Sequence, residues 1–155
     1  MEYYDGGDYS HLFLITIITT LLITAGAGVV AWLVTSIALS MFFNRVGVDT
    51  WKAWIPFYNL YMWLRVGGQN GHWIWLALIP YASVVPSIFI YIGMWRTQFA
   101  FARGRDVGLL ILGIFFPFVW LFIIANSKAE YRPELITAAG YPPPLAGYGS
   151  AQPPA

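Results

Sequence analysis

Residues 51–75 read WKAWIPFYNLYMWLRVGGQNGHWIW, and this stretch decides the fold because it combines charge, proline and dense aromatic residues with little apolar length. Only twelve residues separate Lys52 from Arg65. An uncharged run of about 10 to 14 residues is more typical of an interfacial or re-entrant segment than of a membrane span. Pro56 disfavours helix at the preceding residue and suits a first helical position, so we predict a helix from Pro56 to Val66. At about 1.5 Å per residue, that helix covers roughly half of the hydrocarbon layer.

The aromatic side chains of this stretch suit the headgroup boundary, where a ring buries its body and keeps its polar tip wet. We therefore interpret residues 51–71 as a half-span helix that lies in the interface or dips from it, ending in a turn at GGQNG, residues 67–71. Asn59 follows Pro56 by three residues, and a bond to nearby backbone explains it without any ligand. The candidate anchor and docking residues are Trp51, Trp54, Pro56, Asn59, Tyr61, Trp63 and Arg65.

The composition is that of an integral membrane protein, because 59% of the 155 residues are hydrophobic and only 10% are charged. A net charge of +1, with basic residues scattered along the chain, gives no electrostatic footprint for nucleic acid. The chain has no cysteine and two histidines, so we expect neither disulfides nor thiolate chemistry nor a metal site built from these residues. No cofactor is predicted, and the lipid bilayer is the partner that organises the fold.

The N-terminal part of the chain holds the clearest span. Residues 1–10 are acidic, contain no Lys or Arg, and so lack the basic region of a cleavable signal. No charged residue lies between Tyr9 and Asn44, a run longer than the roughly 20 residues that cross a hydrocarbon core. Small and hydroxyl side chains recur on one face of this run, and the candidate helix-packing residues are Thr16, Thr20, Thr24 and Gly28. We interpret this stripe as intramolecular packing, with a dimer interface as the alternative.

Two further uncharged runs predict two more spans, from His72 to Trp95 and from about Val107 to Ser127. Asp106 is a natural N-cap for the second of these runs. Prolines within the runs predict breaks or kinks, which lipid tolerates only where freed carbonyls face protein or water. These prolines are Pro80, Pro86 and Pro117.

The predicted fold is therefore an all-α integral membrane protein with three full transmembrane helices plus the short, proline-started aromatic half-span or re-entrant helix. Four transmembrane helices are the alternative. The helical membrane domain covers residues 11–132. Residues 133–155 are rich in Pro, Gly and Ala without amphipathic period, so we predict a disordered tail with polyproline II character.

The Lys and Arg residues in the loops predict the orientation. With three spans and the N-terminus outside, five lie inside (Arg45, Lys52, Arg65, Lys128, Arg132) and three outside (Arg96, Arg103, Arg105). The four-helix alternative gives about the same count. Both therefore predict an outside N-terminus.

A short motif recurs three times, with a proline between a large apolar residue and an aromatic one. Its copies are Ile55-Pro56-Phe57, Ile79-Pro80-Tyr81 and Phe116-Pro117-Phe118. Broken helices at matching depth mark some transporter repeats. The unequal spacing of the three copies and the general abundance of proline in membrane helices argue against a repeat here.

Several of these residues together resemble a known family. The sequence WKAWIPFYNLYMWLRVGG, the tryptophan-rich run with IPY, and the FPF run that ends in NSKAEY are similar to a family of small multi-span bacterial membrane domains of unknown function. Its members occur alone or appended to other modules, including type I signal peptidases, and often carry proline-rich tails. The resemblance covers about Gly47 to Tyr131, with IPYASVVP departing from the pattern. It implies a bacterial inner (plasma) membrane location and brings no catalytic residues.

Three classes of function follow, in decreasing order of support. The first is an accessory, assembly or scaffold protein that packs against a membrane-protein partner or forms a homo-oligomer. The second is a small transporter or channel component, for which Asn59, Gln98, Arg65 and Arg96 are the polar candidates. An enzyme is not predicted, because no acidic residue lies within a span and no nucleophile is paired with a base by spacing.

Overall fold

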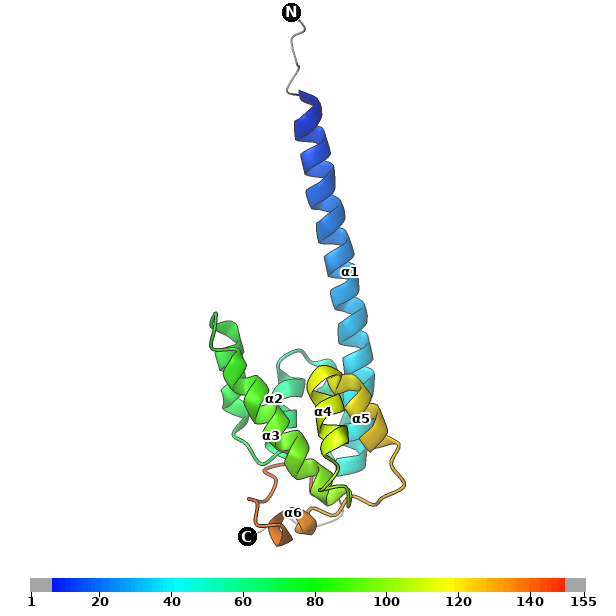
Figure 1. Cartoon of the computed structure of the whole chain (residues 1–155), viewed down its shortest axis with the longest axis vertical. Coiled ribbons are helices and arrows are strands. Elements are labelled where there is room, and N and C mark those ends of the chain that lie inside the picture. Colours follow the sequence, from blue (N-terminus) through cyan, green and yellow to red (C-terminus); the bar gives the residue numbers. More distant parts are fainter. Residues whose placement is uncertain (1–6, 150–155) are drawn as a thin grey trace, which may run out of the picture. The chain divides into compact units, whose positions relative to one another are not determined.

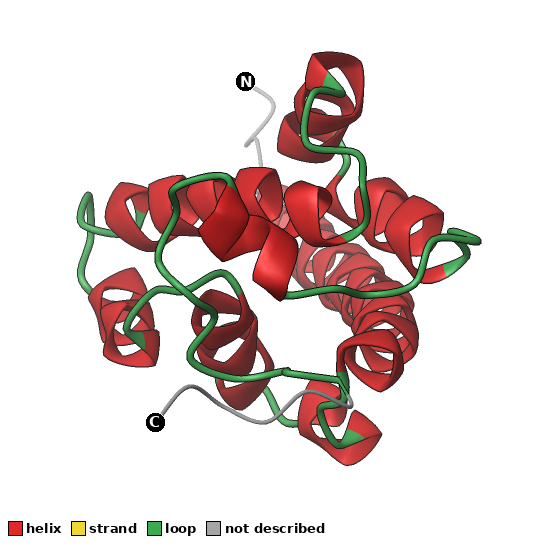
Figure 2. Ribbon diagram, turned by 90° about the horizontal axis from the view of Figure 1, so that it is seen from below, coloured by secondary structure: helices red, strands yellow, loops and turns green. Residues whose placement is uncertain are grey.

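A computed structural model describes residues 7–149, and within them it contains helices and loops but no strand (Figures 1 and 2). The helices are α1 (Gly7–Val46), η1 (Thr50–Trp54), α2 (Tyr58–Val66), η2 (Gly71–Leu78), α3 (Val84–Ala100), α4 (Val107–Phe115), α5 (Pro117–Ala125) and α6 (Glu134–Ala138), where η denotes a 3₁₀-helix. The all-α prediction is thus confirmed. The residues up to Val34 and those from Thr35 onward form two separate units, and the boundary lies within α1.

Helix α1 is long because nothing in its sequence stops it: no proline interrupts residues 7–46, and the first residues that favour an end are Arg45 and Gly47. Within the described part of the chain, it is the one helix long and apolar enough to cross a membrane, over Tyr9–Val46. Its side chains from 9 to 33 are exposed. The first predicted span is therefore present as a helix of sufficient length.

The second and third predicted spans are each divided, and the structure does not support a count of three spans or of four. The run from His72 to Trp95 is split between the 3₁₀-helix η2 and the helix α3, with residues 79–83 as a turn. The later run is split into α4 and α5 at Phe116, just before Pro117. The physical reason is proline, which lacks a backbone donor and clashes with the preceding helical turn.

Several local predictions for residues 51–75 and for the start of α4 are confirmed, with small shifts in the helix bounds. Helix α2 ends at Val66 as predicted, but it begins at Tyr58 because Phe57 takes a positive φ of 63° and reverses the chain there. The sequence GGQNG forms the turn before η2. Asp106 caps α4, since its side chain accepts a hydrogen bond of 3.0 Å from the Leu109 N–H.

The core of the second unit lies between the last three turns of α1 and the helices α3 and α5. Phe42, Leu39 and Trp120 are fully buried there, and the Phe42 and Trp120 rings lie 6.0 Å apart. Gln98 is also fully buried, and its amide, oriented to match its neighbours, accepts from Trp120 Nε1 at 3.0 Å and donates to the Asp106 carbonyl at 3.2 Å. A hydrogen-bonded polar group is tolerated in such a core.

The C-terminal segment corrects the prediction of a disordered tail for the residues up to 149. Helix α6 buries Ile136, and beyond it the Leu145 N–H donates to the Arg65 carbonyl at 2.8 Å. The Gly149 N–H donates to the Val46 carbonyl, also at 2.8 Å. The composition of the segment does not predict this docking. A few backbone and aromatic contacts are enough to order a segment that consists mostly of small residues. The predicted tail residues 150–155, and residues 1–6 of the predicted acidic segment, lie outside the described residues.

Candidate docking surface

A row of stacked aromatic rings lies on the exposed side of residues 51–72. Trp51 and Tyr58 stack at 6.2 Å between ring centroids, Tyr58 and Tyr61 at 5.7 Å, and His72 meets Tyr61 edge-on at 5.4 Å. We call these four residues the aromatic ladder. Tyr58 and Tyr61 are three residues apart on α2, so they lie on one face of the helix and their rings can stack. Trp51 and His72 come from η1 and η2 on either side.

Two cations lie over rings of the aromatic ladder. Lys52 Nζ lies 5.8 Å from the Trp51 ring centroid and forms an ion pair of 2.7 Å with Asp49. The Arg65 guanidinium lies 5.9 Å from the Tyr61 ring centroid. Each contact is within the range of a cation–π attraction, worth about 0.5–1 kcal/mol at an exposed site. The ladder is therefore an apolar surface with one cation at its Trp51 end and another beside Tyr61.

A cavity of about 310 Å³ opens beside the aromatic ladder. Its walls are almost entirely apolar and come from α2, η2 and the turn before α2, namely Pro56, Phe57, Tyr58, Tyr61, His72, Ile74 and Trp75. The positive φ of Phe57 is unusual for a bulky residue, and such strain is found most often at binding sites and tight turns. An apolar side chain of a partner, or a lipid chain, fits this lining chemically.

The predicted anchor residues divide into an inner and an outer group. Asn59 and Trp63 point inward and are buried. Asn59 donates to the Ala53 carbonyl at 3.3 Å, which confirms a local bond, while Trp63 Nε1 has no hydrogen-bond partner among the described residues. Trp51, Trp54 and Pro56 are exposed, whereas Tyr61 and Arg65 are half-buried. Only the outer group can therefore contact a partner.

The anchor residues predicted from the sequence include neither Tyr58 nor His72, although both belong to the aromatic ladder. Tyr58 could have been found, because its three-residue spacing from Tyr61 puts both rings on one helical face. His72 gave no such signal. It reaches the ladder because Gly71 lies against the Tyr61 ring, where an added Cβ would lie 2.5 Å from a ring carbon.

Arg65 has a role that its position in the sequence did not indicate. Its Nη2 donates to the Leu145 carbonyl at 2.9 Å, and its own carbonyl accepts from the Leu145 N–H. This reciprocal pair fixes the C-terminal segment to the end of α2. The guanidinium therefore serves the tail and the Tyr61 ring rather than a bound substrate.

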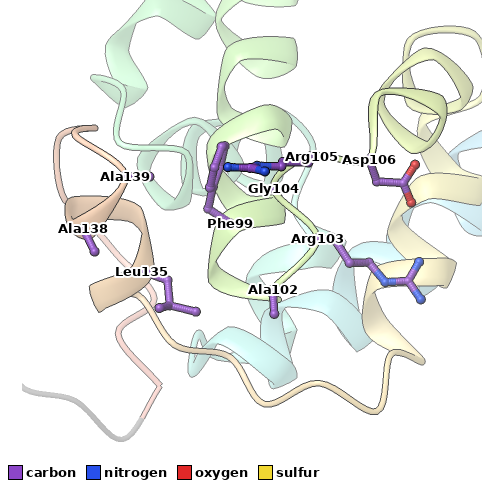
Figure 3. A pocket seen from close by; sticks show the side chains of 9 residues that line it. All are labelled: Phe99, Ala102, Arg103, Gly104, Arg105, Asp106, Leu135, Ala138 and Ala139. Carbon is purple, nitrogen blue, oxygen red and sulfur yellow. The ribbon is translucent and has the colours of Figure 1, made fainter.

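A second, larger cavity of about 730 Å³ lies between the α3–α4 loop and α6 (Figure 3). Its polar lining residues are Arg103, Arg105 and Asp106, and its apolar ones include Phe99 and Leu135. Figure 3 shows Arg105 extending toward Phe99, whereas Arg103 and Asp106 point away from α6. The two guanidinium groups do not converge, so this cavity has no defined anion site.

The stripe on α1 lies in the first unit, and its four residues are exposed there. Thr16, Thr20, Thr24 and Gly28 are all exposed, and nothing lies within 4 Å of a Cβ built on Gly28. Packing of these four residues against another helix therefore stays a prediction. Two of the hydroxyls are satisfied by the helix itself, since Thr16 donates to the Leu12 carbonyl and Thr20 to the Thr16 carbonyl, each at 2.8 Å.

Comparisons with known proteins give one match. A family model described as a family of unknown function, DUF5684, matches residues 51–133. No curated protein and no solved structure matches the chain. The matched region begins with the aromatic ladder and ends just before α6.

Proposed function

The chain belongs to DUF5684, a family of unknown function, and from that premise we propose that it is a membrane-anchored accessory protein. In this proposal α1 crosses a bacterial inner membrane with its N-terminus outside. The helical unit from Thr35 onward then carries the aromatic ladder as a docking surface for a membrane-protein partner.

The observation that carries the proposal is the distribution of charge about α1. All eight Lys and Arg residues lie from Arg45 onward, and none precedes the apolar part of the helix. Positive loop residues remain on the cytoplasmic side of a membrane. A single span with the N-terminus outside therefore places Arg45 and Lys52, the cations nearest the end of the helix, inside and none of this sequence's cations outside. We prefer one span because α1 is, among the described residues, the one helix long and apolar enough to cross a membrane.

The alternative of a transporter or channel is weaker because its polar candidates are already engaged. Asn59 and Gln98 are buried and bonded within the protein. Arg65 binds the C-terminal segment, and Arg96 Nη1 donates to the Gly67 carbonyl at 3.4 Å. A substrate path needs polar groups that face a cavity, and these four do not line either cavity described above.

The partner proposal is tested by detergent co-purification of the tagged chain at native expression. We expect a stoichiometric membrane protein, and we expect Trp51→Ala with Tyr58→Ala to lower its recovery at least tenfold, which corresponds to about 1.4 kcal/mol. Large aromatic residues contribute most of the binding energy in such surfaces. Tyr9→Ala, an exposed aromatic residue on α1, is the matched control and should recover the partner normally. Unchanged recovery with the double variant, in protein that stays folded, would refute the docking surface.

A further inference from the structure

The three proline motifs occupy equivalent places in the fold. Residues 55–57 join η1 to α2, residues 79–81 begin the turn between η2 and α3, and residues 116–118 join α4 to α5. Each motif therefore lies at a junction where the chain leaves one short helix and enters the next. We call these three junctions the proline turns.

The proline turns expose large apolar side chains. The exposed fractions are 46% for Phe57, 97% for Tyr81 and 51% for Phe116, and the aliphatic residues Ile55 and Ile79 are 42% and 53% exposed. Soluble surfaces do not normally concentrate such residues at several neighbouring turns. No charged residue lies within nine positions of the second or third turn.

The proline turns lie on one side of the unit from Thr35 onward. Figure 1 shows the turn between η2 and α3 and the turn between α4 and α5 directed to the same side, away from α6. The first turn lies beside η2, the helix that leads into the second turn, because Phe57 and Trp75 line one cavity.

Most of the positive charge lies at the other ends of the same helices. Arg65 closes α2, Arg103 and Arg105 follow α3, and Lys128 follows α5. Arg45, at the end of α1, donates to the Ser127 carbonyl at 2.7 Å and so lies beside the same end of α5. The unit thus has an apolar side and a basic side.

The first residue of each proline turn accepts a backbone hydrogen bond from a donor just after the turn. Proline itself has no backbone donor. The Asn59 N–H bonds to the Ile55 carbonyl at 3.0 Å, the Ala82 N–H to the Ile79 carbonyl at 3.1 Å, and the Val119 N–H to the Phe116 carbonyl at 3.0 Å. A turn can lie in hydrocarbon only when its polar backbone groups are satisfied internally. Proline at these positions serves that requirement.

Helix length limits how far the first and third turns can reach. Helices α2, α4 and α5 have 9 residues each, or about 14 Å at 1.5 Å per residue. The hydrocarbon core is about 30 Å thick. These helices can enter one leaflet but cannot cross both.

We infer that the three proline turns are re-entrant tips. They insert among lipid acyl chains from the inner face of the membrane, while the basic side of the unit stays at that face. The inference rests on the proposed function in one respect, because α1 is what holds the unit at the bilayer. Lipid is favoured over a protein partner as the occupant because the second and third turns have no charged residue within nine positions, and Lys52, the cation nearest the first turn, has a side chain long enough to reach the headgroups.

The chain has no cysteine, so single cysteines can report the depth of each turn. Ile55→Cys, Tyr81→Cys and Phe116→Cys are labelled with a fluorophore in vesicles of phosphatidylcholine and phosphatidylglycerol. We expect brominated lipid to quench these labels at least twofold more than a label at Ala138→Cys in α6, and aqueous iodide to quench them less. Leu22→Cys on α1 is the lipid-embedded control.

The two proposals fail differently. Iodide-accessible turns with a lipid-embedded Leu22 label would overturn the re-entrant tips and leave the anchor standing. An aqueous Leu22 label would refute the anchor itself.

Sidedness gives a second test. The second and third proline turns each close a helical hairpin. Asn70→Cys, Arg103→Cys and Lys128→Cys lie before and after these two hairpins, and the three wild-type side chains are exposed. All three should react with an impermeant maleimide from the same side. Labelling from opposite sides would mean that a hairpin crosses the membrane, and it would overturn the inference.

Discussion

Tyr131 and Gln98 are both buried polar residues, and they contribute to stability in opposite ways. The Tyr131 hydroxyl has no hydrogen-bond partner among the described residues, while its ring packs 5.2 Å from Phe101. Gln98, by contrast, bonds to Trp120 and to backbone. An unmade bond in a core carries the full desolvation penalty, whereas a made bond offsets it.

Tyr131→Phe should therefore leave the free energy of unfolding unchanged or raise it, by up to about 1 kcal/mol. Burial raises the pKa of the Tyr131 phenol above its usual value, so the folded state binds this proton more tightly than the unfolded state does. Stability should then fall in the wild type as pH rises above about 10, and the variant should lose less of it. Chemical denaturation in detergent at pH 8 and pH 11 measures both effects.

Gln98→Leu provides the contrast. It leaves the Trp120 Nε1 donor without its partner, so it should lower the free energy of unfolding by about 1–3 kcal/mol. Equal stability of Gln98→Leu and the wild type would show that the amide bonds contribute nothing.

At the scale of elements, the C-terminal segment is held to α3 chiefly by Tyr141. Its hydroxyl accepts from Trp95 Nε1 at 3.0 Å, its ring lies 5.3 Å from Phe99, and the Arg96 guanidinium lies 5.9 Å from the ring centroid. One aromatic residue of the segment thus contacts three residues of α3, which are Trp95, Arg96 and Phe99.

Tyr141→Ala should lower the thermal midpoint and increase proteolysis of the segment after α6, with a loss of about 2–4 kcal/mol for a half-buried aromatic ring. Tyr141→Phe keeps the ring and should lose only about 1 kcal/mol. If both variants matched the wild type in stability and protease resistance, Tyr141 would not be what holds the segment to α3.

The elements differ in how far the sequence predicts them. The start of α4 at Asp106, the end of α2 at Val66 and the turn at GGQNG depend on residues within a few positions, so local rules found them. The second and third predicted spans are each two helices and not one. The length of an uncharged run predicts a span, but it does not show that Pro80 and Pro117 divide the helix within that run. The partner of Arg65 is Leu145, 80 positions away, and no local pattern reports a contact of that range.

At the scale of the whole molecule, the cations define one orientation, and it can be measured. With one span, His11→Cys should react with an impermeant maleimide only from outside the cell, and Lys128→Cys only after the membrane is opened. Both substitutions replace exposed side chains, so folding should be unaffected. Reaction of both cysteines in intact cells would contradict a single span with an inside C-terminal unit.

The contacts of the C-terminal segment also set the order of events during biosynthesis. Val46 and Val66 line the place where Gly147 fits, with a Cβ built on that glycine only 3.1 Å from each of their side chains. At translation rates of about 5–20 residues per second, the 80 positions between Arg65 and Leu145 correspond to an interval on the order of 4–16 s. During that interval the ends of α1 and α2 have been synthesised, but the C-terminal segment that packs on them has not. The nascent chain therefore presents an apolar surface that the folded protein hides, and any chaperone or partner that acts on it must arrive before residues 145–149 dock.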